Sequence, residues 1–191
     1  MTAIHRFFLR IASPRLALVL GLALVALMAA ANLLDFPGSV PRIRELSGGP
    51  TILDMMPLVS PDRAFETISA YGDAGRRQYF LLLGTIDVAL PLLAAGFLGV
   101  ALTLAYRGRG ALAWLNLIGV IALGLDYLEN AGILAMLLAF PVRLDLVARL
   151  TGVTTLLKFG FYFGGLLVLL AGALWRRPRR RPRTERHSAA G

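Results

Sequence analysis

The chain has 191 residues, and 57% of them are hydrophobic, whereas soluble domains have roughly 45–50% with glycine included. It has no cysteine, which excludes disulfides, thiolate metal sites and thiol nucleophiles. The two histidines, His5 and His187, both lie in the charged ends, which argues against a histidine metal site or a histidine-based triad. We therefore expect an integral membrane protein.

The N-terminal part consists of a basic segment, residues 1–15, and an apolar run, residues 16–34. The basic segment has three arginines and no acid. The apolar run has roughly 19 residues, which is enough to cross a hydrocarbon core of about 30 Å. We interpret it as the first span, and cleavage as a signal peptide near residues 29–31 is the competing interpretation.

Residues 35–78 are a polar loop between the first two apolar runs. Turn-forming residues at 36–39 and 47–50 predict an irregular chain there. Ser60-Pro61-Asp62 then has the pattern of an N-cap, a first-turn proline and a first-turn acid, and it predicts a short helix at about 61–71. The apolar face of that helix favours packing on the bundle as a lid, and a solvated connector is the alternative.

Three further spans follow, over residues 79–106, 112–140 and 150–175. The first of them contains Pro91, which cannot donate a hydrogen bond to the carbonyl of Asp87. A kink and a free acceptor are therefore expected at that point. The chain is predicted to be an all-α membrane protein, a four-helix transmembrane bundle with a short helix in its first outer loop. It ends in a basic tail, residues 176–191, which is expected to be disordered.

The arginine distribution predicts the orientation in the membrane. If both termini are cytoplasmic, that side has twelve arginines against the single acid Glu185, and the opposite side has seven arginines and seven acids. The positive-inside rule then places both termini in the cytoplasm of a bacterial inner membrane. The tail is expected to anchor this topology and to contact anionic lipid, and nucleic-acid binding is not expected.

Polar residues inside the apolar spans are the candidate site. A charged side chain at bilayer depth costs at least about 2.5–3.5 kcal/mol, so such groups usually face the bundle interior and a partner. Counting residues from the outer end of each span places the candidates at a similar depth in the membrane. A turn of 100° per residue places them on the inward faces of their helices. Asn32 and Asp35 are expected to close the outer end of the bundle. The candidate cluster consists of Asp87, Asp126, Glu129, Asn130 and Lys158.

Charge balance within the cluster is unequal, because three carboxylates face one lysine. We expect Lys158 to pair with Glu129 and Asp126 to be neutral near pH 7, unless a cation or Arg76 enters the cluster. The cluster is either a buried network that fixes helix register, a ligand site, or a site of proton or ion movement.

The spacing of several polar residues resembles a group of small, uncharacterised bacterial four-span membrane proteins. The similarity covers about residues 54–141 and consists of Tyr71-Gly72-x-x-Gly75-Arg76-x-x-Tyr79, then Asp87 and Pro91, then Asp126-x-x-Glu129-Asn130. The resemblance implies an inner-membrane protein in which Arg76 and Tyr79, on the outer side, belong with the intramembrane acids. It implies no activity, and without a zinc, haem or nucleotide motif we expect no metal and no cofactor.

These features favour a non-enzymatic or unassigned multi-pass inner-membrane protein with a buried polar cluster, and a ligand of that cluster would be lipid-like or a small amphiphile. The ligand would enter from the outer side under the 61–71 helix, with Glu129 and Lys158 at its polar end. One alternative is an enzyme that uses paired carboxylates as general acid and base on a lipid substrate. Another is proton- or ion-coupled transport by an oligomer. Glycines that would support contact with a second copy or a partner membrane protein are Gly96, Gly99, Gly160, Gly164 and Gly165.

Overall fold

The computed structural model describes residues 3–49 and 52–175, so the basic tail and the expectations for it lie outside the described residues. Within these ranges every regular element is a helix. Four helical segments are long and apolar enough to cross a membrane: Pro14–Leu33, Gly72–Tyr106, Gly110–Ala139 and Asp145–Trp175. The predicted all-α fold with four membrane-spanning candidates is therefore confirmed.

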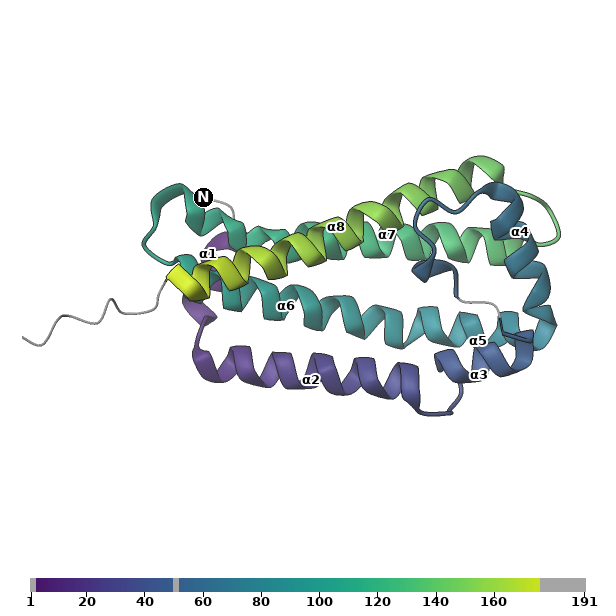
Figure 1. Ribbon diagram of the computed structural model, residues 1–191, viewed down its shortest axis with the longest axis horizontal. Helices are drawn as coiled ribbons and strands as arrows, with labels where there is room; N and C mark the ends of the chain where they lie inside the picture. Colours follow the sequence, from purple (N-terminus) through teal and green to yellow (C-terminus); the bar gives the residue numbers. More distant parts are fainter. Residues whose placement is uncertain (1–2, 50–51, 176–191) are drawn as a thin grey trace, which may run out of the picture.

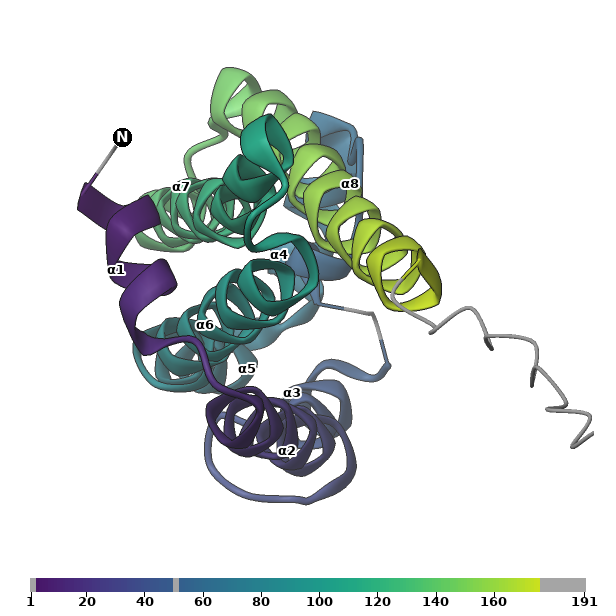
Figure 2. The same cartoon turned by 90° about the vertical axis from the view of Figure 1, so that its left-hand side faces the viewer.

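The helix α2, Pro14–Leu33, lies at the edge of the bundle and packs along α6, Ile86–Tyr106 (Figures 1 and 2). Ser13 begins it, because the Ser13 hydroxyl accepts the Leu16 N–H at 3.2 Å. Most of its surface is exposed and apolar, as a lipid-facing helix requires. The remaining spans, α6, α7 (Ile118–Ala139) and α8 (Asp145–Trp175), pack against one another and form the interior.

The position of α2 overturns one expectation. Asn32 and Asp35 do not close the end of the bundle, since both are exposed. The Asn32 side chain instead donates to the Met28 carbonyl of its own helix at 2.9 Å. The reason is that α2 packs chiefly on one span, α6, so the end of α2 lies beside the three-helix interior and not over it.

The second and third spans each contain a break in the regular α-helix. The second consists of α5, Gly72–Gly84, and α6, joined at Thr85, whose φ of −127° and ψ of −78° are not helical. The interruption therefore precedes Pro91, which lies inside α6, and the kink expected at the proline stays a prediction. The third span begins with a 3-10 helix, η2 (Gly110–Leu117), before α7 starts.

The first loop is more regular than its turn-forming residues predict, because it contains α3, Val40–Ser47. Ser39 accepts the Arg42 N–H at 3.3 Å, and Pro41 occupies the first turn, where no donor is needed. Gly48 ends the helix with a φ of +70°, a left-handed conformation that suits glycine. Two of the residues taken for turns, Ser39 and Gly48, are therefore the caps of a short helix.

The predicted short helix is present as α4, Pro61–Ala70, and it packs on α8. Its N-terminus is formed as the sequence indicates, with the Ser60 hydroxyl accepting the Arg63 N–H at 3.2 Å. A single 3-10 turn, η1 (Leu53–Met55), lies before it and contacts α7. We call the end of the molecule that carries α3, η1 and α4 the loop end. The larger hydrophobic core lies there, and its fully buried members include Tyr71 and Tyr79.

The opposite end, which we call the α1 end, is covered by the short helix α1, Ala3–Ile11. Phe8 packs against Gly99 of α6 so closely that a side chain at Gly99 would collide with its ring. His5, which the sequence places in a charged terminal segment, is fully buried and bonds through Nδ1 to Asn116 Oδ1 at 2.9 Å. Its ring also stacks on Trp114 with centroids 4.6 Å apart. The basic N-terminal segment is thus docked on the bundle.

The glycines of the spans fall into two groups. Gly96, Gly99 and Gly165 are used inside the molecule, where a Cβ would meet Leu20, Phe8, and Ile118 with Leu98, respectively. Gly160 and Gly164 face open space on α8. Close contacts between the helices of one chain therefore account for the first group.

Candidate functional site

Lys158 lies at the centre of the buried cluster, on α8. Its Nζ forms an ion pair with Glu129 Oε2 and lies 3.8 Å from Asp126 Oδ1. The two acids are three residues apart on α7, so both point toward α8. Glu129 is fully buried, and Lys158 is 6% exposed. The expected ion pair of Lys158 with Glu129 is therefore present.

Two hydroxyl groups of α8 complete the partners of these acids. Thr155 donates to Glu129 Oε1, and Tyr162 donates to Asp126 Oδ2 at 3.2 Å. Residues 155, 158 and 162 share one face of α8, which is the face that the sequence predicts to point inward. Every carboxylate oxygen of Asp126 and Glu129 thus faces an ammonium or hydroxyl group from α8.

Asp87, on α6, is in a different situation. Its side chain is buried, and its Oδ2 has no hydrogen-bond partner among the described residues. Its backbone carbonyl, which Pro91 leaves without a helical donor, accepts from Asn130 Nδ2 at 3.1 Å. Tyr127 of α7 donates to the next carbonyl, that of Val88, at 2.9 Å. Side chains of α7 therefore satisfy the backbone around Pro91, and Asp87 Oδ2 stays without a hydrogen-bond partner.

The loop end contributes one acid that sequence analysis missed. Asp54, in η1, accepts from the Tyr79 hydroxyl at 2.8 Å and interacts electrostatically with the acids of the cluster. It is 9% exposed. A usable signal existed, since Asp54 is a lone acid within an apolar stretch, Ile52-Leu53-Asp54-Met55-Met56. Tyr79 therefore connects the loop to the second span.

Arg76, the other candidate of the outer side, does not reach the acids of the cluster. It forms an ion pair with Asp73 and donates to the Ile68 carbonyl at 3.3 Å. Its guanidinium also lies 4.2 Å from the ring centroid of Phe140. These contacts hold α5 against α4 and the end of α7, so Arg76 neutralises none of the buried carboxylates.

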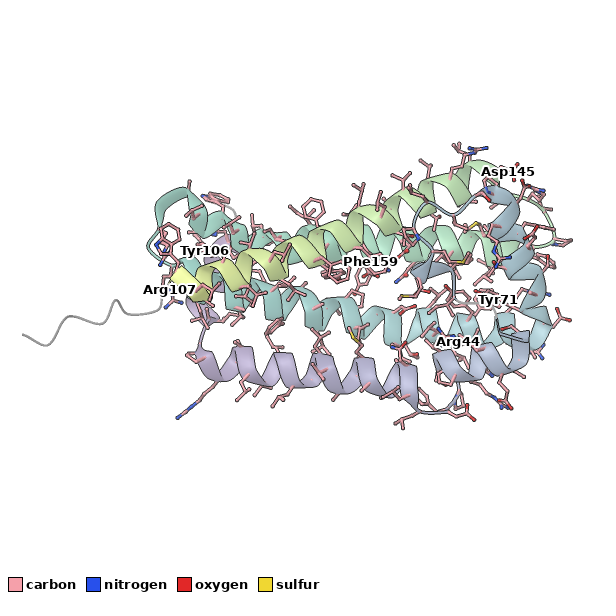
Figure 3. All side chains as sticks on the ribbon, in the orientation of Figure 1. Arg44, Tyr71, Tyr106, Arg107, Asp145 and Phe159 are labelled. Atoms are coloured by element: carbon pink, nitrogen blue, oxygen red, sulfur yellow. The ribbon has the colours of Figure 1, made fainter. Side chains whose placement is uncertain are left out.

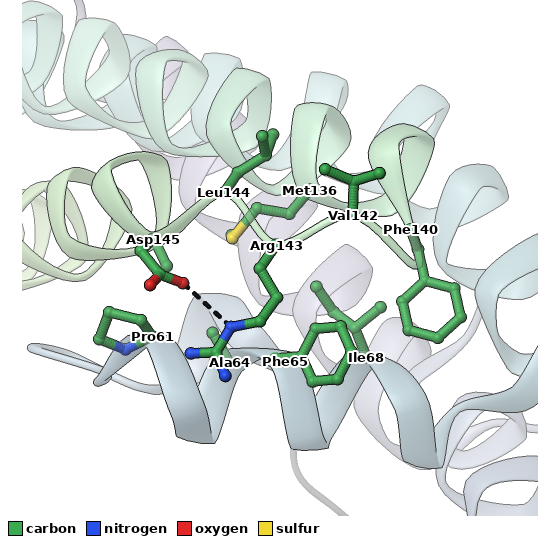
Figure 4. Close-up of a pocket in the computed structure, with 11 residues that line it drawn as sticks. Pro61, Ala64, Phe65, Ile68, Met136, Phe140, Val142, Arg143, Leu144 and Asp145 are labelled. Carbon is green, nitrogen blue, oxygen red and sulfur yellow. Dashed lines mark hydrogen bonds and ion pairs between the residues drawn. The ribbon is translucent and has the colours of Figure 1, made fainter.

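A small pocket of about 20 Å³ lies under α4 (Figure 4). Its walls are mostly apolar and come from α4, the end of α7 and the start of α8. Arg143 lies at its rim and donates to Asp62 Oδ1 at 2.5 Å and to Asp145 Oδ1 at 3.2 Å. These hydrogen bonds, with Asp62 the stronger influence, raise the pKa of the Arg143 guanidinium above its usual value. Arg143 thereby links α4 to α8.

The cluster lies about midway between the two ends of the molecule. Phe159, the residue after Lys158, is near the middle of the long axis in Figure 3, whereas Tyr71 is at the loop end and Tyr106 at the α1 end. Among residues 3–49 and 52–175, no group of three or more His, Asp or Glu side chains is arranged to hold a metal ion. The chemistry available is that of acids, one amine, hydroxyls and an amide.

Fold and site together define a class of protein: an all-α chain with four helices able to cross a membrane and with charged residues buried between three of them. Comparison with models of known families, with curated proteins and with solved structures gives no match. The function is therefore argued from the site.

Proposed function

We propose that the chain is a multi-pass membrane protein that binds a small amphiphilic ligand at its buried polar cluster. The observation that supports this most strongly is the Asp87 carboxylate, which is buried and has an oxygen without a partner. A carboxyl oxygen buried without a hydrogen-bond partner costs free energy whether or not the group is charged. The two acids of α7 show that this chain provides donors where it needs them. An occupant at Asp87 would remove the cost.

The polar end of the ligand is assigned to Asp87 and Asn130. The sequence suggests Glu129 and Lys158 for this role, but these two side chains are engaged with each other. Asp87 and Asn130 lie at the contact of α6 with α7 and keep free acceptor atoms. The apolar part of the ligand would extend toward the loop end. Entry under α4 is supported by the pocket there, because α4 covers a space that already accommodates about one water molecule.

The proposed orientation places the loop end outside and the α1 end in the cytoplasm of a bacterial inner membrane. The unequal distribution of arginine supports it. Aromatic and basic residues at the α1 end also support it, since the Arg109 guanidinium lies 4.3 Å from the Trp175 ring centroid, as expected at a membrane boundary. The bacterial assignment rests on the resemblance to small four-span proteins.

Mass spectrometry of gently purified protein tests the proposal. Small molecules that co-purify are compared between the parent chain, Asp87→Asn and the matched control Asp35→Asn, whose side chain is exposed. We expect one enriched amphiphile with the parent and the control, and its loss from Asp87→Asn. The same bulk lipid in all three preparations would contradict the proposal and leave the cluster a structural network. A second, related molecule that accumulates on Asp87→Asn would favour the enzyme instead.

A further inference from the structure

The geometry points to a cationic hydrogen-bond donor, such as the protonated primary amine of an amphiphile, as the group bound between Asp87 and Asn130. This inference rests on the proposed function and names the chemistry of the ligand's polar end. Three observations lead to it: the kind of atoms left without partners, the orientation of the Asn130 amide, and the charge balance of the surrounding cluster.

The unpartnered atoms of the cluster are all oxygens. Buried side-chain atoms there without a hydrogen bond are Asp87 Oδ2, Asn130 Oδ1 and Glu129 Oε2. The last of these has the Lys158 ammonium beside it. A carboxylate oxygen and an amide oxygen accept hydrogen bonds and cannot donate them. The two remaining atoms therefore call for a donor, and a second acceptor in their place would add to the cost.

The orientation of the Asn130 amide follows from its partner. The Asp87 carbonyl can only accept, so the nitrogen of the amide has to face it, at 3.1 Å. The oxygen of the same amide is then the atom left free. It belongs to α7, and Asp87 Oδ2 belongs to α6, so acceptors from two helices are available at one helix contact. Because Pro91 removes the backbone donor, this orientation is built into the sequence.

Charge selects among the possible donors. Asp87, Asp126 and Glu129 lie within the spans, Asp54 adds its field from the loop, and Lys158 is the cation that interacts with them. Arg76 does not compensate, because it pairs with Asp73. An anionic head group would therefore be repelled. A neutral hydroxyl would satisfy one acceptor and leave the charge, whereas an ammonium group would satisfy both oxygens and the charge.

The N–H groups of the ligand matter as much as its charge. A primary ammonium has three donors and is compact, so it offers N–H groups to both acceptor atoms, Asp87 Oδ2 and Asn130 Oδ1. A trimethylammonium group carries the same charge but has no N–H. It would leave both acceptors without hydrogen bonds. The site is therefore expected to distinguish the two cations.

Three C12 compounds test the inference with the full chain in a non-ionic detergent at pH 7: dodecylamine, dodecanol and dodecyltrimethylammonium. Binding is measured by titration against the thermal unfolding of the protein. We expect dodecylamine to bind at least about tenfold more tightly than dodecanol, since charge-assisted hydrogen bonds are roughly twice as strong as neutral ones. Dodecyltrimethylammonium should also bind more weakly than dodecylamine. Asp87→Asn should remove the preference for the amine, and Asp35→Asn should keep it.

The possible failures are distinguishable. If dodecanol binds the parent chain as tightly as dodecylamine, the inference is wrong and amphiphile binding stands. If none of the three compounds binds, the proposed function fails as well. Preference for the amine that persists in Asp87→Asn would overturn the assigned position. Folding of the variant is checked by circular dichroism and gel filtration, and the three compounds decide the chemistry with the parent chain alone.

Discussion

The buried acids on the two sides of α7 differ in whether their oxygens have donors as partners. Toward α8, Asp126 and Glu129 face a donor at each oxygen. Toward α6, Asp87 is as buried as Asp126, since both are 8% exposed, but its Oδ2 has no partner. Burial alone therefore does not separate structural acids from functional ones. The supply of donors differs between the two sides, and this difference is why we propose that the α8 side stabilises the fold and the α6 side binds a ligand.

The α1 end contains another buried polar network, which can be compared with the one around Asn130. Asn116 Oδ1 accepts a hydrogen bond from His5 Nδ1 at 2.9 Å, and Asn116 Nδ2 donates to the Thr103 hydroxyl at 3.0 Å. Thr103 in turn donates to the Gly99 carbonyl at 2.7 Å. Both ends of the Asn116 amide are engaged, unlike those of Asn130. A buried amide with one free end is thus a distinctive feature of the α6–α7 contact.

The largest effect is expected from Lys158→Met, which breaks the ion pair on the α8 side. Removal of one partner from a buried pair leaves an uncompensated charge and costs about 3–5 kcal/mol of stability. The free energy of unfolding in mixed micelles measures it. The double variant with Glu129→Gln should recover most of the loss, because no unpaired carboxylate then remains at that position. A Lys158→Met protein as stable as the parent would show that the α8 side is not a stabilising pair.

A smaller effect is expected from Asn130→Leu, which removes the donor to the Asp87 carbonyl. A buried carbonyl left without a partner costs about 1–3 kcal/mol. Tyr127→Phe is the control, since it removes the hydrogen bond to the neighbouring Val88 carbonyl at a more exposed position and should cost less. The same unfolding measurement compares them. Equal stability of Asn130→Leu and the parent would mean that the carbonyl freed by Pro91 needs no donor.

The spans and the α8 side of the site are predictable from the sequence. Runs of apolar residues long enough to cross a membrane define the helices, and a period of 3.6 places Thr155, Lys158 and Tyr162 on one face. The depth of the acids in their spans then indicates which charges meet. These arguments use only helix geometry, which is the same in every helix. For that reason the pair of Lys158 with Glu129 follows without knowledge of the loops.

The contacts of non-periodic segments are not predictable in this way. Asp54 approaches the cluster because η1 folds against α7, and His5 is buried because α1 docks on η2 and α6. Both depend on the path of the chain between elements, which no periodicity encodes. The role expected for Asn32 and Asp35 fails for the same reason, because α2 packs mainly on one span and does not join the interior. Arg76 had a nearer partner, Asp73, one helical turn away.

The smallest effect on stability is expected from Asp87→Asn, and it tests the comparison most directly. The amide has nearly the shape of the carboxyl group and carries no charge, so the substitution breaks no hydrogen bond of Oδ2. The free energy of unfolding of Asp87→Asn should stay within about 1 kcal/mol of the parent or rise. The matched change Glu129→Gln removes the ion-pair partner of Lys158 and should cost about 3–5 kcal/mol. Unfolding of both variants under the same conditions decides between them. Equal losses would mean that Asp87 has a structural partner, and the α6 side would then be no more a binding site than the α8 side.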